Sequence, residues 1–170
     1  MKLFLKNLLF TLLVPGTVTV WLPYAWFWKR NEFHSPIWIS FAVTLIVVGT
    51  AIYLRCVWDF AAGGRGTPAP IDPPKALVVR GLYRYVRNPM YLGVLLVLMG
   101  EALIFPSRGF LLYILAFFSL VNVFIILYEE PRLHRQFGES YGEYRRAVPR
   151  WIPGLRKTKE PSSRPSRVPR

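Results

Sequence analysis

Hydrophobic residues gather in four long stretches, and polar residues are largely confined to the segments between them. The stretches comprise residues 3–28, 37–60, 89–105 and 110–128. A helix needs roughly 20 apolar residues to cross a bilayer, and all four approach or exceed that length, although the third is the shortest. The chain of 170 residues is 53% hydrophobic and only 18% charged, which is unusual for a soluble domain. The pattern predicts an all-α, polytopic membrane helix bundle with about four transmembrane helices.

The connections between the stretches constrain how the helices are arranged. Only the residues "PSRG" separate the third stretch from the fourth, which predicts a tight antiparallel hairpin. Pro15, Gly16 and Pro23 lie inside the first stretch and predict kinks there. Basic residues precede this stretch, as in a secretory signal, but no small-x-small cleavage site follows it. We therefore interpret the first stretch as a membrane span.

Lys and Arg are unevenly distributed among the segments that flank the stretches. Residues 61–88 contain five of them and the residues after Tyr128 contain eleven, whereas Lys29, Arg30 and Arg108 are the basic residues on the other side. Because basic loops stay on the cytoplasmic side, both termini are predicted to be cytoplasmic, in a plasma or inner membrane or in the endoplasmic reticulum. The net charge of +13 then reflects topology and attraction to anionic lipid, so no nucleic-acid partner is predicted.

The polar segments predict one membrane domain, residues 1–153, followed by a tail. Residues 61–74 contain too much Gly and Pro for a regular helix and are interpreted as a linker or a substrate gate. Residues 132–144 mix charged and aromatic side chains, which predicts a short amphipathic helix in the cytoplasmic interface. Pro, Ser, Lys and Arg dominate residues 154–170, which predicts a basic, disordered tail.

The motif "RYVRNPMYLG" introduces the third stretch. Asn is a favoured helix N-cap and Pro a favoured first residue, so the helix is predicted to begin at Pro89 with Asn88 as its cap. The start of a helix offers unpaired N–H groups and a partial positive charge, which suit a carboxylate or phosphate. Gly93 would let a ligand approach the backbone. The alternative is that this pair only caps a transmembrane helix, while Arg84 and Arg87 contact lipid phosphate.

Glu129 and Glu130 end the fourth stretch on the same side of the membrane. A carboxylate at a helix C-terminus opposes the macrodipole and is costly near a bilayer, so a compensating cation is expected. That cation is either an arginine, with Arg84, Arg87 and Arg132 as candidates, or a cationic ligand. Adjacent residues point in different directions around a helix, so one glutamate can bind an arginine while the other faces a ligand.

Amides, carboxylates and aromatic faces are thus expected to meet at one end of the bundle. S-adenosylmethionine carries a carboxylate, an ammonium and a sulfonium, which match these three kinds of group. The aromatic faces would come from Tyr83, Tyr85, Tyr91 and Tyr128. The residues therefore indicate a site for S-adenosylmethionine. Cys56, His34 and His134 are too scattered to predict a metal site.

Two segments carry a resemblance to a known family. "GLYRYVRNPMYLG" and "YEEPRLHRQFGESYGEYRRAVPRW" resemble the integral-membrane methyltransferases that include isoprenylcysteine carboxyl methyltransferases and phospholipid N-methyltransferases. The resemblance covers roughly residues 64–153. Asn88 stands where the isoprenylcysteine enzymes usually carry His, so the motifs are more similar to the phospholipid type.

The resemblance implies that residues 64–153 form the cofactor-binding part, in which S-adenosylmethionine binds at the cytoplasmic face between residues 87–93 and Glu129-Glu130, and that a lipid-like acceptor enters from the bilayer. The acceptor would be a prenylcysteine carboxylate, a phospholipid amine or another amphiphile. The implied cofactor-binding residues are Arg87, Asn88, Pro89, Tyr91, Gly93, Glu129 and Glu130. Tyr141, Tyr144 and Arg150 are expected to close the site.

The predicted reaction is SN2 transfer of a methyl group to an oxygen or nitrogen of the acceptor, for which the protein aligns the reactants and excludes water. Arg87 and Arg150 are the candidate catalytic residues, because either would orient an acceptor carboxylate. With an amine acceptor, a glutamate would hold the amine or take up its proton. Two alternatives stay open: an NADPH-dependent enzyme similar to the sterol reductases, and a non-catalytic helical membrane scaffold.

Two further acids lie in or near the apolar stretches. Arg55 and Asp59 stand four residues apart, so they are expected to pair while reaching toward the cytoplasmic surface. Glu101 lies inside the third stretch and is expected to be hydrogen-bonded within the bundle, with an acceptor site as the alternative.

Overall fold

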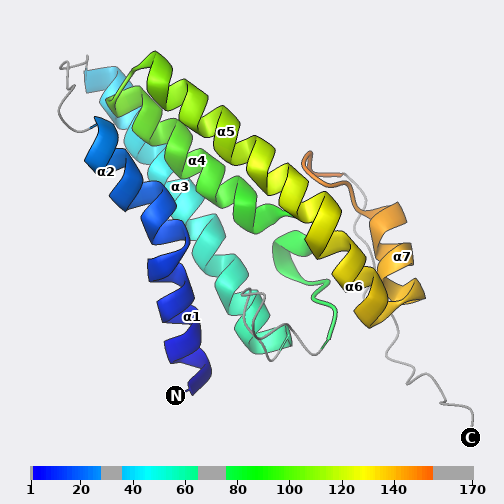
Figure 1. The fold of residues 1–170 in the computed structure, drawn as a ribbon. Helices are drawn as coiled ribbons and strands as arrows, with labels where there is room; N and C mark the ends of the chain where they lie inside the picture. The colour runs from blue at the N-terminus through cyan, green and yellow to red at the C-terminus, as the bar shows by residue number, and fades with distance from the viewer. Residues whose placement is uncertain (1, 28–35, 65–75, 155–170) are drawn as a thin grey trace, which may run out of the picture.

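The fold is described from a computed structural model, which covers residues 2–27, 36–64 and 76–154. Every regular element in these ranges is helical, as predicted (Figure 1). Most of the predicted linker and nearly all of the predicted tail lie outside the described residues.

The first apolar stretch folds as an interrupted helix. It comprises α1 (Lys2–Leu13), a π-helical turn η1 (Thr17–Trp21) and α2 (Leu22–Phe27). The π-helical turn directly follows Pro15-Gly16, where proline removes a backbone donor and interrupts the regular hydrogen-bonding pattern. The interruption therefore falls where the first proline predicts it, and the helix as a whole is long and apolar enough to cross a membrane.

The remaining helices complete the bundle. They are α3 (Pro36–Asp59), which continues into a π-helical turn η3 (Phe60–Gly64), α4 (Pro89–Ile104) and α5 (Arg108–Phe124). Three helical stretches in the described ranges are long and apolar enough to span a membrane, and α4 is a shorter apolar helix of 16 residues. The prediction of about four membrane helices is confirmed.

The fourth helix does not end where the sequence predicted. It passes through a π-helical turn η5 (Ile125–Glu129) into α6 (Glu130–Phe137), so that one helical stretch runs from Arg108 to Phe137. Pro131 falls in the first turn of α6, after the π-helical turn, where its missing N–H is tolerated. Both glutamates therefore lie inside a helix, and the prediction that they sit at a helix C-terminus was wrong.

The cytoplasmic helix predicted at residues 132–144 is divided between two elements. Its first part belongs to α6, and its second part forms α7 (Glu139–Ala147). Gly138 separates them with a φ of 56°, a conformation that glycine adopts more readily than other residues. The chain turns sharply at this residue, which places α7 beside α6 (Figure 1).

The closest helix pair is α3 with α4, and glycines make it possible. A Cβ atom on Gly49 would lie 2.5 Å from the Gly93 carbonyl oxygen, and one on Gly93 would lie 2.7 Å from the Gly49 oxygen. Gly100 meets the Ala42 oxygen in the same way, at 2.7 Å. Small residues let membrane helices approach backbone to backbone. Gly93 therefore faces α3, and the approach of a ligand to its backbone stays a prediction.

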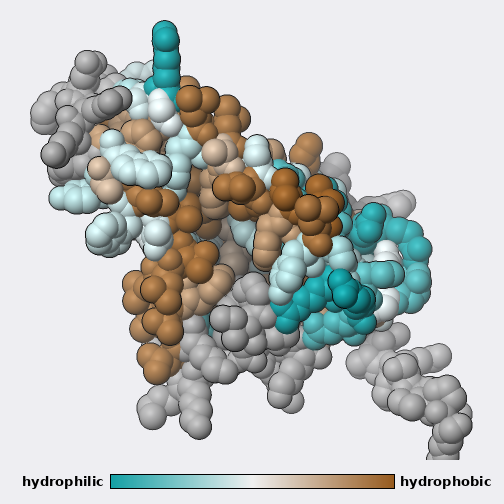
Figure 2. All heavy atoms as spheres, viewed as in Figure 1, coloured by the Kyte–Doolittle hydropathy of each residue, from teal (hydrophilic) through white to brown (hydrophobic). Residues whose placement is uncertain are grey.

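Apolar and polar side chains are segregated along the bundle. A buried cluster joins α2, α3, α4 and α5 through Phe27, Tyr53, Leu98 and Phe110. Many large hydrophobic side chains elsewhere are exposed, and Figure 2 shows them along the helices, whereas hydrophilic residues gather over α6 and α7. An apolar surface of this extent is typical of a protein whose helices face lipid.

Candidate functional site

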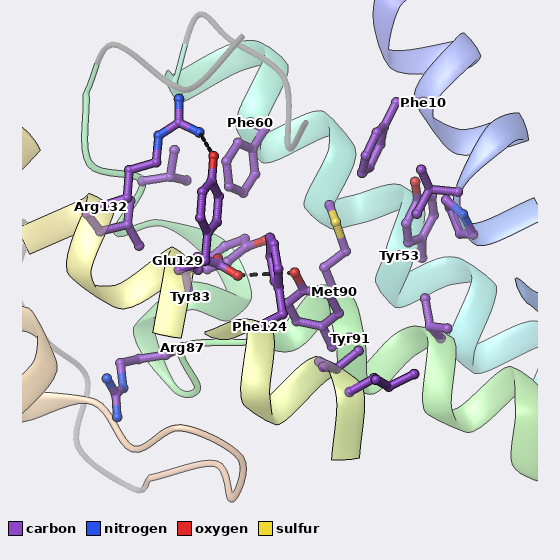
Figure 3. Close-up of a pocket in the computed structure, with 18 of the residues that line it drawn as sticks. Phe10, Tyr53, Phe60, Tyr83, Arg87, Met90, Tyr91, Phe124, Glu129 and Arg132 are labelled. Atoms are coloured by element: carbon purple, nitrogen blue, oxygen red, sulfur yellow. Dashed lines mark hydrogen bonds between the residues drawn. The ribbon is translucent and has the colours of Figure 1, made fainter. Parts of the chain in front are cut away.

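A cavity of about 540 Å³ lies where α1, α3, α4 and the α5–α6 helix meet (Figure 3). Its volume falls within the range of roughly 300–1,000 Å³ that small-molecule sites occupy. Most of the lining side chains are apolar or aromatic. The charged residues in the lining are Arg87, Glu129 and Arg132. A mostly apolar cavity with a few polar groups at one end suits an amphiphilic ligand.

Glu129 contributes a carboxylate to the cavity. It belongs to the π-helical turn η5, and the Tyr91 hydroxyl donates a hydrogen bond to its Oε2 atom over 3.1 Å (Figure 3). Tyr91 lies in the first turn of α4, so this bond joins the two helices whose approach the hairpin predicted. Tyr83, Phe60 and Phe124 place aromatic rings in the same part of the cavity.

Glu130 points elsewhere and is bound by two arginines. Arg87 Nη1 donates to Glu130 Oε1 at 2.9 Å, while Arg150 donates through Nε to Oε1 at 2.9 Å and through Nη2 to Oε2 at 3.1 Å. The Glu130 side chain is only 9% exposed. One carboxylate thus shares two guanidinium groups, and the cluster carries a net positive charge. The adjacent glutamates have separate surroundings, as expected from their positions on a helix.

The two candidate catalytic arginines belong to this cluster. Arg87 lines the cavity, but its guanidinium turns away from Glu129, as Figure 3 shows. Arg150 is not among the cavity-lining residues of the described chain. In this conformation both guanidinium groups therefore bind Glu130, outside the space that a ligand in the cavity would occupy.

The start of α4 agrees with the prediction in position but not in detail. The helix begins at Pro89, and Asn88 occupies the N-cap position. The Asn88 side chain does not cap the helix, so that part of the prediction was wrong; its Nδ2 instead donates to the Arg150 carbonyl at 3.4 Å. Met90 and Tyr91 line the cavity, whereas Asn88 and Pro89 do not. The free first-turn amides of α4 thus belong to residues in the cavity wall.

Three buried tyrosines pack where α7 meets the segment before α4. The Tyr144 hydroxyl donates to the Tyr83 carbonyl oxygen over 2.8 Å, and both residues line the cavity. Tyr141 packs with Tyr144 and Val148 behind it. Burial raises the pKa of all three tyrosines above the ordinary value, so each hydroxyl keeps its proton at neutral pH. Tyr144 therefore lines the cavity, and Tyr141 packs beside it in the same buried cluster.

The sequence profile of the phospholipid methyltransferase family matches residues 37–140. The chain belongs to this family. The matched region includes the start of α4 and both glutamates, and thus the polar end of the cavity.

Known relatives of this phospholipid methyltransferase family member agree with the assignment. It is 38% identical over 93 residues to "Methanethiol S-methyltransferase 2" of Bradyrhizobium diazoefficiens, which covers 52% of this chain and 35% of the relative. It is 37% identical over 78 residues to "Protein-S-isoprenylcysteine O-methyltransferase" of Schizosaccharomyces pombe, which covers 45% and 33%. The chain thus spans about a third of the length of each.

An uncharacterized protein of Haemophilus influenzae is 35% identical over 63 residues, which is 37% of this chain and the whole of that relative. No solved structure matches the chain. The Bradyrhizobium and Schizosaccharomyces relatives are both methyltransferases by name, and the apolar helices of this chain indicate an integral membrane protein.

The sequence of this family member gave no signal for several residues that form its cavity. Phe10, Val14 and Val18, from the first helical stretch, line the apolar part. They carry no chemistry that a motif would reveal, and only the folded chain brings them to α4 and α5. Arg132, by contrast, was a candidate cation in the sequence; it lines the polar part of the cavity, where it donates to the Tyr128 hydroxyl over 2.8 Å and lies 5.7 Å from the centre of that ring.

Asp59 pairs with Arg55 at 3.5 Å, as predicted, but also with Arg80 at 3.4 Å. Its side chain is fully buried, so the expectation that it reaches toward the surface was wrong. The carboxylate occupies the space where a side chain on Gly81 would lie. Asp59 thus fastens the segment that carries Tyr83 to the end of α3.

Proposed function

We propose that the protein transfers a methyl group from S-adenosylmethionine to an oxygen or nitrogen of a lipid-like acceptor. The observation that carries the proposal is the separation of the two glutamates. Glu130 takes up both arginines, while Glu129 faces an aromatic cavity and accepts a hydrogen bond from a neutral tyrosine. A carboxylate placed in this way suits a cationic ligand.

The polar end of the cavity offers a partner for each charged group of the cofactor. Glu129 suits the ammonium group, and the rings of Tyr83, Tyr91 and Phe124 suit the sulfonium. The first-turn amides at Met90 and Tyr91 suit the carboxylate, because the start of a helix favours anions. The cofactor, when bound, supplies an electrophilic methyl group. The residues of this chain would bind it, align it and exclude water.

The apolar end of the cavity suits the hydrocarbon part of the acceptor. Phe10, Val14, Val18 and Phe117 line this end, and all belong to helical stretches long and apolar enough to span a membrane. We propose that the acceptor arrives from the bilayer and presents its nucleophile to the polar end. A prenylcysteine carboxylate, a phospholipid amine and another amphiphile all fit this description.

The nature of the acceptor decides which residues assist the transfer. An acceptor amine loses a proton on methylation, and Glu129 is the lining carboxylate that can hold the amine or take up that proton. An acceptor carboxylate needs a cation to orient it. Arg87 or Arg150 would supply one only by leaving Glu130, to which both are bound.

Equilibrium binding of S-adenosylmethionine and of NADPH to the detergent-purified protein tests the proposal. We expect S-adenosylmethionine to bind and NADPH not to bind. Incubation with the methyl-labelled cofactor and lipid extracts should then place the label in an extractable amphiphile. Preferential binding of NADPH, or tight cofactor binding without any labelled product, would contradict the proposed reaction.

A further inference from the structure

Residues 148–154, which we call the strap, run from the end of α7 back toward α5 (Figure 1). Two backbone hydrogen bonds fasten the strap to the segment before α4. Arg87 N–H donates to the Pro149 oxygen over 2.9 Å, and Gly154 N–H donates to the Tyr85 oxygen over 2.8 Å. The strap is therefore fixed to the residues that lead into the cavity.

A side-chain clamp fastens the strap to α5. The Trp151 indole Nε1 donates to Asn122 Oδ1 over 2.9 Å, and the Trp151 ring lies 5.0 Å from that of Phe118. Asn122 also donates from Nδ2 to the Phe118 carbonyl, so both ends of its amide are hydrogen-bonded. An amide on an otherwise apolar membrane helix is costly unless it is paired in this way. The clamp thus explains why a polar residue stands at position 122.

Arg150 lies between the two anchors, next to Trp151 in the strap. From there it binds Glu130 through two nitrogens, while Arg87 binds the same carboxylate from the other side. Glu130 and Glu129 are consecutive in one helical stretch, so the contacts that hold Glu130 also help to fix the backbone that carries Glu129. The strap therefore links a contact on α5 to the carboxylate in the cavity.

We propose that Asn122 and Trp151 are positioning residues for the cofactor site. Their clamp keeps Arg150 bound to Glu130, so that Glu129 stays directed into the cavity, where it can bind the ligand. When the clamp is lost, Arg150 is held less firmly, Glu130 has Arg87 as its remaining arginine, and the direction of Glu129 is less well fixed. This inference rests on the proposed function, because it assumes that the ligand at Glu129 is S-adenosylmethionine.

The test compares the affinity for S-adenosylmethionine of the wild-type protein and its variants in detergent. Trp151→Phe keeps the ring against Phe118 but removes the indole donor, and Asn122→Ala removes its acceptor. Each change should weaken binding about three- to tenfold, the effect of losing one hydrogen bond. The double variant should bind no more weakly than Asn122→Ala alone, because the Trp151–Asn122 bond is already lost in that single variant. Trp38→Phe, at an exposed tryptophan on α3, is the control and should bind like the wild type.

A second comparison separates positioning from general stability. In an Arg150→Ala background, Trp151→Phe should no longer change the affinity, since its effect passes through Arg150. Unchanged affinity in both clamp variants, or additive losses, would overturn the inference even where the melting temperature falls. Failure of the wild-type protein to bind S-adenosylmethionine would instead overturn the proposed function, so the two failures are distinguishable.

Discussion

Two adjacent glutamates with the same chemistry occupy very different surroundings. Glu129 accepts a hydrogen bond from a tyrosine and faces the cavity, whereas Glu130 is buried between two arginines. Substituting each by glutamine removes one negative charge and little volume. Glu129→Gln should therefore lower affinity with little loss of stability, whereas Glu130→Gln should lower stability and, through the position of Glu129, affinity as well.

Glu129→Gln should weaken S-adenosylmethionine binding at least about tenfold, because it replaces a charge-assisted contact to the ammonium by a neutral one. The melting temperature should change little. Isothermal titration calorimetry in detergent measures the affinity. An undiminished affinity would remove Glu129 from the cofactor site.

Glu130→Gln should mainly destabilise the protein, by about 2–4 kcal/mol, because it leaves the guanidinium groups of Arg87 and Arg150 without their carboxylate. Thermal unfolding in detergent measures the effect. Glu139→Gln is the matched control, since Glu139 pairs with Arg146 on the surface and such pairs contribute little. Equal losses in the two variants would show that the Glu130 cluster has no special structural role.

At the scale of helices, the site depends on how α4 is held. The backbone of α4 packs on that of α3 at Gly49, Gly93 and Gly100, and this contact fixes the helix that carries Tyr91. The glycines of this contact touch the neighbouring helix and not the polar residues of the cavity. Disrupting the contact should therefore first lower the stability of the protein.

Gly93→Ala should destabilise the protein by about 1–3 kcal/mol, because the new methyl group would press on the Gly49 oxygen and the Tyr53 nitrogen. Thermal unfolding again gives the measurement. Gly142→Ala, in α7, is the control: its nearest neighbour would lie 3.5 Å away, and alanine favours a helix over glycine. A Gly93→Ala variant as stable as the wild type would mean that the α3–α4 contact relaxes easily.

Local sequence signals predicted the helices better than their ends. The apolar stretches predicted the three helices long enough to span a membrane and the shorter apolar helix α4, and Asn-Pro predicted the start of α4 at Pro89. The cap was wrong because the Asn88 side chain turns to a carbonyl of residue 150, which is remote in sequence. The end at Tyr128 was wrong because hydropathy falls there, although the helical backbone continues to Phe137. Polarity marks where apolar surface ends, which need not be where a helix ends.

At the scale of the whole molecule, the polar ends of α3, α4 and the α5–α6 helix lie together, away from the α4–α5 connection (Figure 1). The excess of Lys and Arg in the segments at this end leads us to propose that it is cytoplasmic. The same excess would hold it against anionic lipid headgroups.

Cysteine labelling tests this orientation. In a Cys56→Ser background, Arg108→Cys lies at the α4–α5 connection and Ser140→Cys at the opposite end, and both positions are exposed. A membrane-impermeant maleimide added to intact cells should label the variant at position 108. Labelling at position 140 should require permeabilised cells. The reverse pattern would place the site on the outer face.

The sequence predicted the polar residues of the site but not the contacts that surround them. Two motifs of charged and aromatic residues predicted that Tyr91, Glu129 and Glu130 are neighbours. The chemistry of these side chains can be recognised from the sequence alone. The clamp between Asn122 and Trp151 joins residues 29 positions apart, in segments with no shared pattern. Whether two such segments touch depends on how all the helices are arranged in space, so the contact cannot be predicted from either segment alone.

The π-helical turn at Ile125–Glu129 sets the direction in which the later side chains of the same helix point. Such a turn accommodates one residue more than an α-helical turn, so it acts as a one-residue insertion within α5–α6. If the same residues formed an α-helical turn instead, every side chain beyond the turn would rotate by about 100° about the helix axis. The π-helical turn therefore sets the phase of α6, and with it the direction of Glu130 toward its arginines, without altering a single charge.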